Sequence, residues 1–308
     1  MSQFVPKSID QFKPMEAADY WKLKRQIKYP LYVSPKYDGI RCVIRHEGAQ
    51  TRKLLPIPND YIRTYLSRVQ YKFLDGELIV GSPVSPDVWN VTQSGVMGRE
   101  GNPDWRYYVF DNTGAIGGYE TRQERLLELV EDLADPRIVL VPQIVVRNEE
   151  ELMHVESMIV GHGYEGVMLR PHDGDYYWGR CTNARPWLMK LKRFIDAEAY
   201  CVGVKEQMHN ANEATKDELG RTKRSSHKAN KTGTGTLGAL ICHFVTPEKE
   251  LEGIYDPVEF DIGTGFDDEQ RAAFWKDPPI GKMIKFKFQK LSPAGKPLFP
   301  VYLGIRED

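Results

Sequence analysis

Lys36 is the residue of this chain whose type and setting most clearly allow covalent chemistry. It opens the hexapeptide Lys-Tyr-Asp-Gly-Ile-Arg, which ends at Arg41. An ordinary lysine is protonated at neutral pH, but burial and neighbouring cations such as Arg41 lower the pKa of the amine and free its lone pair. The hexapeptide therefore indicates a nucleophilic amine. A solvated lysine on a surface hairpin is the competing interpretation, because Asp38-Gly39 is a common turn dipeptide.

The residues on either side of Lys36 have the pattern of β-strands. Apolar, β-prone residues occupy 29–33, and Ile40, Cys42 and Ile44 alternate with the residues between them. Such alternation is typical of a half-buried strand. We therefore expect Lys36 to stand at a strand end, held by rigid backbone.

The composition allows a sizeable core and leaves several classes of function open. The chain has 308 residues, 41% of them hydrophobic and 28% charged, a length that suggests two domains. Its net charge of −1 does not indicate a nucleic-acid binder. Evidence for nucleic-acid binding must therefore come from how the charges are distributed along the chain. Residues 1–30 contain no apolar signal segment, and no later stretch is long enough to span a bilayer. We expect a soluble, cytoplasmic protein and a monomer.

The four cysteines do not indicate a metal or disulfide framework. They are widely scattered and form no Cys-x-x-Cys pair, which argues against a zinc site. We expect reduced thiols in the core. The residues are Cys42, Cys181, Cys201 and Cys242.

Two amphipathic helices are predicted in the first part of the chain. Thr121-Arg122-Gln123-Glu124 fits the pattern of a capping box that opens a helix. The apolar residues expected on its buried face are Leu126, Leu127, Val130 and Leu133. A second helix is expected over 148–160, and the residues expected on its inner face are Leu152, Val155 and Ile159.

Short runs of β-branched and aromatic residues predict strands throughout the chain. In the first part they lie at 31–34, 40–46, 72–80, 106–111, 138–146, 165–170 and 187–192. Later strands are expected at 199–204, 237–245, 258–262, 283–288 and 301–306, a spacing that predicts a small β-barrel. We therefore expect an α+β domain over 1–193 and a barrel domain over 194–308. The run Asp267-Asp268-Glu269 is interpreted as the acidic first turn of a short helix.

Two basic stretches in the second part are candidates for contact with a phosphate backbone. The first lies in a long polar loop predicted over 206–236, where residues 216–231 hold six basic and two acidic side chains. The second alternates lysine with apolar residues over 282–290. A solvated flexible loop and an edge strand protected by lysines are the plainer interpretations. The candidate residues for this phosphate contact are Arg221, Lys223, Arg224, Lys228, Lys231, Lys285 and Lys287.

Charged residues also interrupt or end several of the predicted strands of the first domain. These positions are Asp75-Gly76-Glu77, Phe110-Asp111, Glu165-Gly166 and Lys190-Leu191-Lys192. Taken alone, each of these charged positions is more simply interpreted as having a structural role than a catalytic one. Together with Lys36 and in this order, they resemble the nucleotidyltransferase motifs of the superfamily of covalent ligases and mRNA capping enzymes. The resemblance is closest to small ATP-dependent DNA ligases of phage or viral type.

The resemblance extends over nearly the whole chain. Thr51-Arg52-Lys53 adds a further match in the first domain. In the second domain, residues 235–240 and 262–266 are similar to barrel segments of DNA ligases. The resemblance implies a nucleotidyltransferase (ATP-grasp-like) adenylation domain followed by a small OB-fold barrel. It implies ATP as the adenylyl donor, Mg²⁺ as a cofactor and nicked double-stranded DNA as the substrate.

The resemblance also implies a role for each matched residue. Lys36 would attack the α-phosphate of ATP, and Lys190 and Lys192 would hold that phosphate. Phe110 would stack on adenine. The other implied contacts are Arg41 and Glu77 with the ribose, Arg52 with a phosphate or the ribose, and Glu165, with Glu77, as ligands of Mg²⁺.

The C-terminus departs from the family pattern. DNA ligases of this kind commonly end on Arg-x-Arg-x-Asp-Lys, whereas this chain ends Gly304-Ile-Arg-Glu-Asp308. Arg306 and Asp308 still match, so the resemblance implies that Arg306 orients the leaving pyrophosphate.

The sequence therefore predicts a DNA ligase that seals nicks through a lysyl-AMP intermediate. A capping guanylyltransferase uses the same lysine and the same two domains, and an RNA ligase shares the first domain. A non-enzymatic alternative is a nucleic-acid-binding OB module attached to an inactive domain. The intact Lys36 and Glu165 argue against that alternative.

Overall fold

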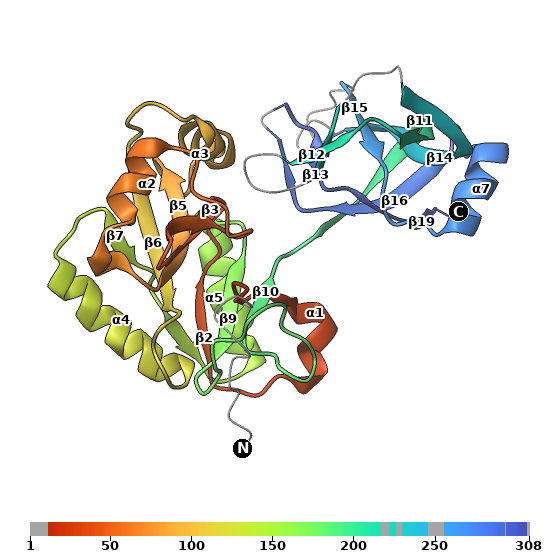
Figure 1. Cartoon of the computed structure of the whole chain (residues 1–308). Coiled ribbons are helices and arrows are strands. Elements are labelled where there is room, and N and C mark those ends of the chain that lie inside the picture. The colour runs from red at the N-terminus through yellow and green to blue at the C-terminus, as the bar shows by residue number, and fades with distance from the viewer. Residues whose placement is uncertain (1–11, 217–221, 226–229, 246–255, 293, 307–308) are drawn as a thin grey trace. The chain divides into compact units, whose positions relative to one another are not determined.

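The structure, a computed structural model, describes residues 12–216, 222–225, 230–245, 256–292 and 294–306 (Figure 1). Within this part the chain forms two compact units, the first ending at Lys192 and the second beginning at Arg193. No helix in the described ranges is long and apolar enough to cross a membrane.

The first unit is built on two five-stranded sheets (Figure 1). The first sheet has the order β1-β10-β9-β2-β8. Its strands are β1 (Ala18–Asp19), β2 (Leu31–Pro35), β8 (Ile144–Val146), β9 (Val167–Pro171) and β10 (Met189–Leu191). The second sheet has the order β4-β3-β5-β6-β7. Its strands are β3 (Ile40–Arg45), β4 (Gly48–Thr51), β5 (Leu74–Val80), β6 (Trp105–Asn112) and β7 (Ile138–Leu140).

Lys36 lies where the chain passes from one sheet to the other. Strand β2 pairs with β8 and β9, whereas β3 pairs with β4 and β5, so β2 and β3 are not partners. The surface hairpin considered for residues 36–39 is therefore wrong. The expectation that Lys36 follows directly on a strand end is confirmed, because β2 ends at Pro35.

Helices cover the outer face of each sheet and enclose separate cores. The second sheet packs against α2 (Asp60–Leu66), α3 (Val88–Met97) and α4 (Tyr119–Leu133). The first sheet packs against α1 (Tyr20–Leu23) and α5 (Glu149–Gly161). Short 3₁₀ turns lie at Lys24–Gln26 and Val69–Tyr71. Helices α2 and α3 were not predicted, since Tyr, Thr, Val and Trp are weak helix formers and tertiary packing overrides their propensity.

Helix α5 confirms the sequence prediction, whereas α4 corrects it. Asn148 caps α5, and all three residues predicted on its inner face are buried. Helix α4, however, begins at Tyr119 and not at a capping box at Thr121. The helix begins two residues earlier because the backbone N–H of Glu120 donates a hydrogen bond to the carbonyl of His172 at 2.9 Å. The buried face contains Arg122, while Leu127 is 45% exposed.

Most predicted strands are confirmed to within two residues. The exception in the first unit is the strand expected over 138–146, which is two short strands, β7 and β8, in different sheets. All four cysteines are buried, as expected of core residues.

The second unit is a five-stranded barrel with the strand order β15-β14-β11-β16-β19. Its strands are β11 (Ile195–Asn210), β14 (Lys231–Phe244), β15 (Val258–Ile262), β16 (Met283–Phe288) and β19 (Val301–Ile305). A parallel bridge between Thr264 and Val301 brings the chain after β15 against β19 and closes the sheet on itself. Helix α7 (Asp268–Lys276) follows β15 and carries the predicted acidic first turn, with a capping box between Asp267 and Gln270. A small pair, β17 (Lys290–Leu291) and β18 (Pro297–Leu298), precedes β19. This is the topology of an OB fold.

The polar loop predicted over 206–236 is largely a β-ribbon in the residues of this range that the structure describes. Strands β11 and β14 remain paired as far as Asn210 and Lys231, with register shifts near Glu206. Beyond them, β12 (Ala214–Lys216) and β13 (Thr222–Arg224) form a two-stranded sheet of their own. The prediction of a loop was wrong because cross-strand pairing orders a backbone whose side chains contribute little to any core. Residues 217–221 and 226–229, which include the candidates Arg221 and Lys228, lie outside the described part.

Gly39 provides a test of the crossing between the sheets. A Cβ atom at this position would lie 2.3 Å from the Leu78 carbonyl oxygen on β5, which is fixed backbone. Gly39→Ala should therefore lower the free energy of unfolding by about 1–3 kcal/mol, the usual cost of overpacking. Urea unfolding monitored by circular dichroism measures the change.

Gly161→Ala is the matched control, since nothing lies within 4 Å of the added Cβ at this last residue of α5. We expect that variant to be as stable as the parent or more stable by up to about 1 kcal/mol. Equal stability of Gly39→Ala and Gly161→Ala would contradict the tight crossing.

Candidate active site

The two sheets of the first unit each turn one polar face toward a common pocket. Along β9 and β10, Val167, Leu169, Met189 and Leu191 enter the core, so the alternate residues face the other way. Lys190, Met168 and Ser34 are consecutive partners across β10, β9 and β2. They form one row on the pocket face of the first sheet, and all three line the pocket.

The second sheet contributes the opposite wall by the same alternation. Ile40 and Cys42 on β3 and Leu78 on β5 point into the core, which leaves Arg41 and Glu77 on the pocket face. Arg41 and Glu77 are direct partners across β3 and β5. They are therefore side by side in the sheet although 36 positions separate them in the sequence.

A β-bulge brings Phe110 to this wall together with its neighbour Asp111. Asp75 pairs with Asp111 and Gly76 with Val109, so Phe110 is the extra residue on β6. A bulge interrupts the strict alternation of side chains along a strand, so that two consecutive side chains can face the same side of the sheet. Phe110 lines the pocket, while Asp111 is completely buried beside it.

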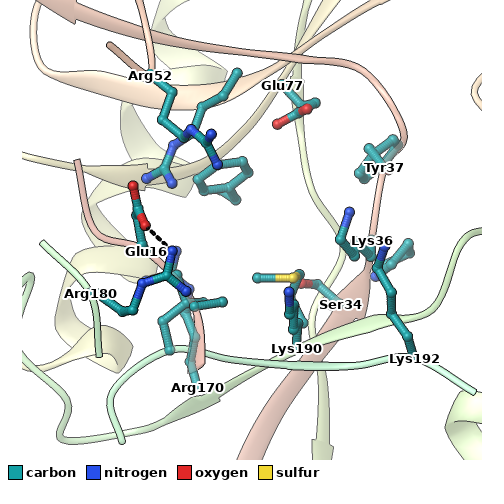
Figure 2. Close-up of a pocket in the computed structure, with 16 residues that line it drawn as sticks. Glu16, Ser34, Lys36, Tyr37, Arg52, Glu77, Arg170, Arg180, Lys190 and Lys192 are labelled. Carbon is teal, nitrogen blue, oxygen red and sulfur yellow. Dashed lines mark hydrogen bonds and ion pairs between the residues drawn. The ribbon is translucent and has the colours of Figure 1, made fainter. Parts of the chain in front are cut away.

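The pocket has a volume of about 320 Å³, which suits a small ligand. Seven of its sixteen lining residues are basic and two are acidic. The basic residues are Lys36, Arg41, Arg52, Arg170, Arg180, Lys190 and Lys192. Figure 2 shows the side chains of Lys36 and Lys192 close together, on the opposite side of the pocket from Glu16 and Arg180. Such a surface favours a polyanion.

Glu165 connects the two lysines. Its carboxylate oxygens contact the Nζ atoms of Lys36 and Lys192, one oxygen to each amine. A backbone hydrogen bond also holds Lys36 next to Glu165, because the Lys36 N–H donates to the carbonyl of Gly166 at 2.8 Å. A Cβ at Gly166 would lie 2.4 Å from the Leu191 carbonyl, so β10 approaches this position too closely for any side chain.

Burial shifts the pKa values of the two central ionisable groups toward each other. It lowers the pKa of Lys36 from its ordinary value, and the carboxylates of Glu77 and Asp38 oppose that shift. Burial also raises the pKa of Glu77 to about 7, which Lys36 and Arg41 oppose. A buried amine with a lowered pKa is the form that a lysine nucleophile requires.

Two buried ion-pair networks hold the walls in place. Arg41 donates from Nε to Asp75 at 2.9 Å and from one terminal nitrogen to the Met15 carbonyl at 2.6 Å. The hydroxyl of Tyr176 donates to the same aspartate at 2.6 Å. The pocket cation Arg41 is thus anchored at the back by a completely buried carboxylate.

The second network is centred on Asp111. Arg122 donates from Nε to this carboxylate at 2.7 Å, and Arg170 donates to its other oxygen at 2.6 Å. The two guanidiniums hold the pKa of Asp111 below its usual range, against the effect of burial. Arg170 and Arg41 also lie 5.7 Å and 5.4 Å from the centre of the Phe110 ring. Both networks therefore reach the aromatic residue of the pocket.

The structure gathers most of the predicted nucleotide-site residues into this one pocket. Those that line it are Lys36, Arg41, Arg52, Glu77, Phe110, Lys190 and Lys192, while Glu165 contacts two of them. Arg306 belongs to the second unit, where it donates to Glu198 at 2.8 Å. Lys285 and Lys287 on β16 are register partners of Glu198 and Asp196 on β11, which offsets part of their charge.

Sequence reasoning missed four polar residues of the pocket. Ser34 stands two positions before the lysine on β2, Arg170 lies on β9, and Glu16 and Arg180 form an ion pair at 2.7 Å. The alternation of β2 and β9 could have indicated Ser34 and Arg170. No signal indicated Glu16 and Arg180, because only the fold brings these distant segments together.

The pocket offers carboxylates but no complete protein cage for a metal ion. The described residues contain no group of three or more His, Cys, Asp or Glu side chains arranged to hold one. Mg²⁺ characteristically binds through one or two carboxylates and takes its other ligands from substrate phosphates and water. Glu165 and Glu77 fit that pattern as donors.

Comparisons with known proteins agree over nearly the whole length of the chain. A family model described as the DNA ligase OB-like domain matches residues 231–306. A DNA ligase of Haemophilus influenzae is 24% identical over 272 residues, which cover 88% of this chain and 84% of that protein. A DNA ligase of African swine fever virus is 27% identical over 293 residues, covering 89% of this chain but only 63% of the viral protein.

A solved structure supports the same relationship. The Chlorella virus DNA ligase-adenylate is 29% identical, with a TM-score of 0.53, and the match covers 96% of this chain and 99% of that one. The fold and site define a class, the nucleotidyltransferases with an attached OB domain. Within this class the chain is similar to the small ATP-dependent DNA ligases. The resemblance and the fold class predicted from the sequence are confirmed.

Glu77 provides a test of the electrostatics of the pocket. Its pKa is about 7 in the folded protein against an ordinary value of 4.5. Between these two pH values the folded protein binds a proton that the unfolded chain has released, so stability falls as the pH rises through this window. Glu77→Gln cannot ionise and should lose less thermal stability between about pH 4.5 and 7 than the parent does. Melting temperatures measured from pH 4.5 to 8 test this.

Glu47→Gln is the control, because the Glu47 side chain is 57% exposed. Its melting curve against pH should run parallel to that of the parent. A Glu77→Gln curve that is also parallel would contradict the raised pKa.

Proposed function

We propose that this protein seals nicks in duplex DNA, joining a 5′-phosphate to a 3′-hydroxyl with ATP as the adenylyl donor. The observation that carries the proposal is the partly buried Lys36, which contacts Glu165 beside Lys192 at a pocket whose charged lining residues are mostly cations. The DNA ligase relatives give the reaction class.

In the first step Lys36 would attack ATP. Its Nζ lone pair forms a bond to the α-phosphorus, the bond from that phosphorus to the bridging oxygen breaks, and pyrophosphate leaves with the electron pair. The nitrogen loses one proton, and AMP remains attached as a phosphoramidate. The lowered pKa of Lys36 favours the neutral amine that this step needs.

The other pocket residues would bind and orient the nucleotide. Lys190 and Lys192 offset the charge that develops on the α-phosphate, which is where most catalysis of phosphoryl transfer lies. Phe110 stacks on adenine, and Glu77 contacts the ribose. Arg52 contacts a phosphate or the ribose. The guanidinium of Arg41 already donates to Asp75 and Met15, so we assign it to shaping the ribose side of the pocket.

Mg²⁺ would be held by Glu165, with Glu77, and would neutralise phosphate charge during the transfer.

In the later steps AMP would pass from Lys36 to the 5′-phosphate at the nick, and the 3′-hydroxyl would then attack that phosphate and release AMP. Arg306 is proposed to orient pyrophosphate in the first step. Duplex DNA would be gripped by the ribbon of residues 206–236, with Lys285 and Lys287 on the barrel. The protein is proposed to act as a monomer in the cytoplasm.

Lys36 provides the central test. Incubation with α-labelled ATP and Mg²⁺ should give acid-stable label on the protein, and nicked DNA should then take the label. Lys36→Ala should reduce labelling to background, because Lys36 is the amine assigned to attack, while Lys190 and Lys192 are assigned to holding the α-phosphate. Lys22→Ala, a change at an exposed lysine, should label like the parent.

Each other outcome points to a different function. Labelling from GTP but not ATP would identify a capping enzyme. Label that never passes to nicked DNA would indicate RNA as the substrate. A protein that takes no label from either nucleotide would be a binding module.

The ribbon gives a second test. Replacing residues 211–230 by an Asn-Gly turn preserves the last register pair, Asn210 with Lys231. Each phosphate contact contributes a slope of about −0.9 to the logarithmic dependence of binding on salt. We expect weaker binding to nicked DNA and a slope flatter by about 2, with Lys36 adenylylation unchanged. Fluorescence anisotropy over a series of salt concentrations measures both quantities.

Lys296→Gln, at an exposed lysine elsewhere in the barrel unit, is the control for loss of charge alone. If the affinity for nicked DNA is unchanged after the ribbon replacement, this segment does not contribute to DNA binding.

A further inference from the structure

Lys36 and Glu165 come from segments 129 positions apart, yet their side chains meet in the pocket. The backbone explains part of this arrangement, since Pro35 pairs with Val167 across β2 and β9. A lysine has four rotatable bonds beyond its Cα, however, and backbone pairing alone does not fix the position of its Nζ atom.

Each of the two residues has a tyrosine as its neighbour, and the two tyrosines are in contact. Tyr37 follows Lys36 directly, and Tyr164 precedes Glu165 directly. Their ring centres lie 5.4 Å apart with an angle of 78° between the planes, an edge-to-face contact. Tyr108 of β6 stacks on Tyr37 at 4.5 Å. Burial, together with the neighbouring tyrosines Tyr164 and Tyr108, raises the pKa of Tyr37.

The buried members of this cluster belong to neither of the two main cores, although Tyr164 also packs against the core of the first sheet. The cluster's other buried members are Ile79, Val88 and Val141, and the two main cores lie on the outer faces of the sheets. Tyr37 belongs to the crossing between the sheets, Tyr108 to the second sheet, and Tyr164 to the connection from α5 to β9 of the first sheet. The three rings therefore join the sheets beside the nucleophile.

Tyr37 also lines the nucleotide pocket, whereas Tyr164 does not. Any effect of Tyr164 on the reaction must therefore pass through its neighbours. We propose that Tyr164 is a positioning residue which, through its contact with Tyr37, holds the Lys36 amine next to Glu165 for attack on the nucleotide. This inference rests on the proposed function, because it assigns Lys36 as the nucleophile.

The inference predicts which steps depend on Tyr164. Lys36 is the attacking group in the first step and the leaving group in the second. In the third step the 3′-hydroxyl attacks a DNA end that already carries AMP, and the Lys36 amine takes no part. Loss of the Tyr37–Tyr164 contact should therefore slow adenylylation of the protein but spare sealing of a pre-adenylylated nick.

The test compares Tyr164→Leu and Tyr164→Phe with the full-length parent protein. Tyr164→Leu removes the ring and should slow Lys36 adenylylation by about tenfold to a hundredfold, the effect of misplacing a reacting group by about 1 Å. Its KM for ATP and its rate of sealing a pre-adenylylated nick should stay within about threefold of the parent. Tyr164→Phe keeps the edge-to-face contact and should restore most of the adenylylation rate.

The ratio of the two rates supplies a readout that a general loss of stability would not change, because such a loss lowers both rates together. Tyr65→Leu is the matched control, because Tyr65 makes an edge-to-face contact of 5.2 Å with Trp105 in the core of the second sheet. That variant should keep the parental ratio of the two rates.

Tyr164→Met, which fills space without a ring, replaces Tyr164→Leu if the latter does not fold. Adenylylation within about twofold of the parent in the folded variant would overturn the inference. An equal loss of adenylylation and of sealing on the pre-adenylylated nick would overturn it as well. A parent protein that takes no label from ATP would instead contradict the proposed function, so the two failures are distinguishable.

Discussion

The contact between Glu165 and the amines of Lys36 and Lys192 is the interaction around which the first unit is arranged. Two cations of the same sign repel each other when they are brought together in a partly buried pocket, and a carboxylate between them offsets that repulsion. The three residues belong to three segments, so the fold has to align β2, β9 and β10 to within hydrogen-bonding distance. Backbone pairing does this through the bond from the Lys36 N–H to the Gly166 carbonyl and through the close approach of β10 at Gly166.

The opposite wall depends on a different constraint, which is the burial of charge. Asp75 and Asp111 are completely buried, and an isolated buried carboxylate is costly. Each is matched by arginines, Arg41 in one case and Arg122 with Arg170 in the other. Arg41 and Arg170 also face the pocket. The same ion pairs that make the buried acids tolerable thus fix two cations and the Phe110 ring where a nucleotide would bind.

In the barrel unit, several basic side chains lie next to acidic ones. Acidic residues on β11 stand opposite the lysines of β16, and Arg306 pairs with Glu198. The net charge of the chain is only −1, so a phosphate backbone would be attracted by local groups of charge and not by the molecule as a whole. The ribbon that extends from β11 and β14 is one such group, and it is ordered by backbone pairing where composition indicated a loop.

The sequence alone determined the nucleophile candidate, most of the strands, the order of the two domains and the family resemblance, because these depend on local periodicity and on short motifs. It did not determine that residues 36–39 cross between the sheets, or that Arg122 lies on the buried face of helix α4. It also did not determine that the lining of the pocket includes Glu16, Ser34, Arg170 and Arg180. Those features come from contacts between segments far apart in the chain. A lysine becomes a nucleophile only when burial lowers its pKa and other groups hold it in place, and the tertiary structure alone supplies both conditions.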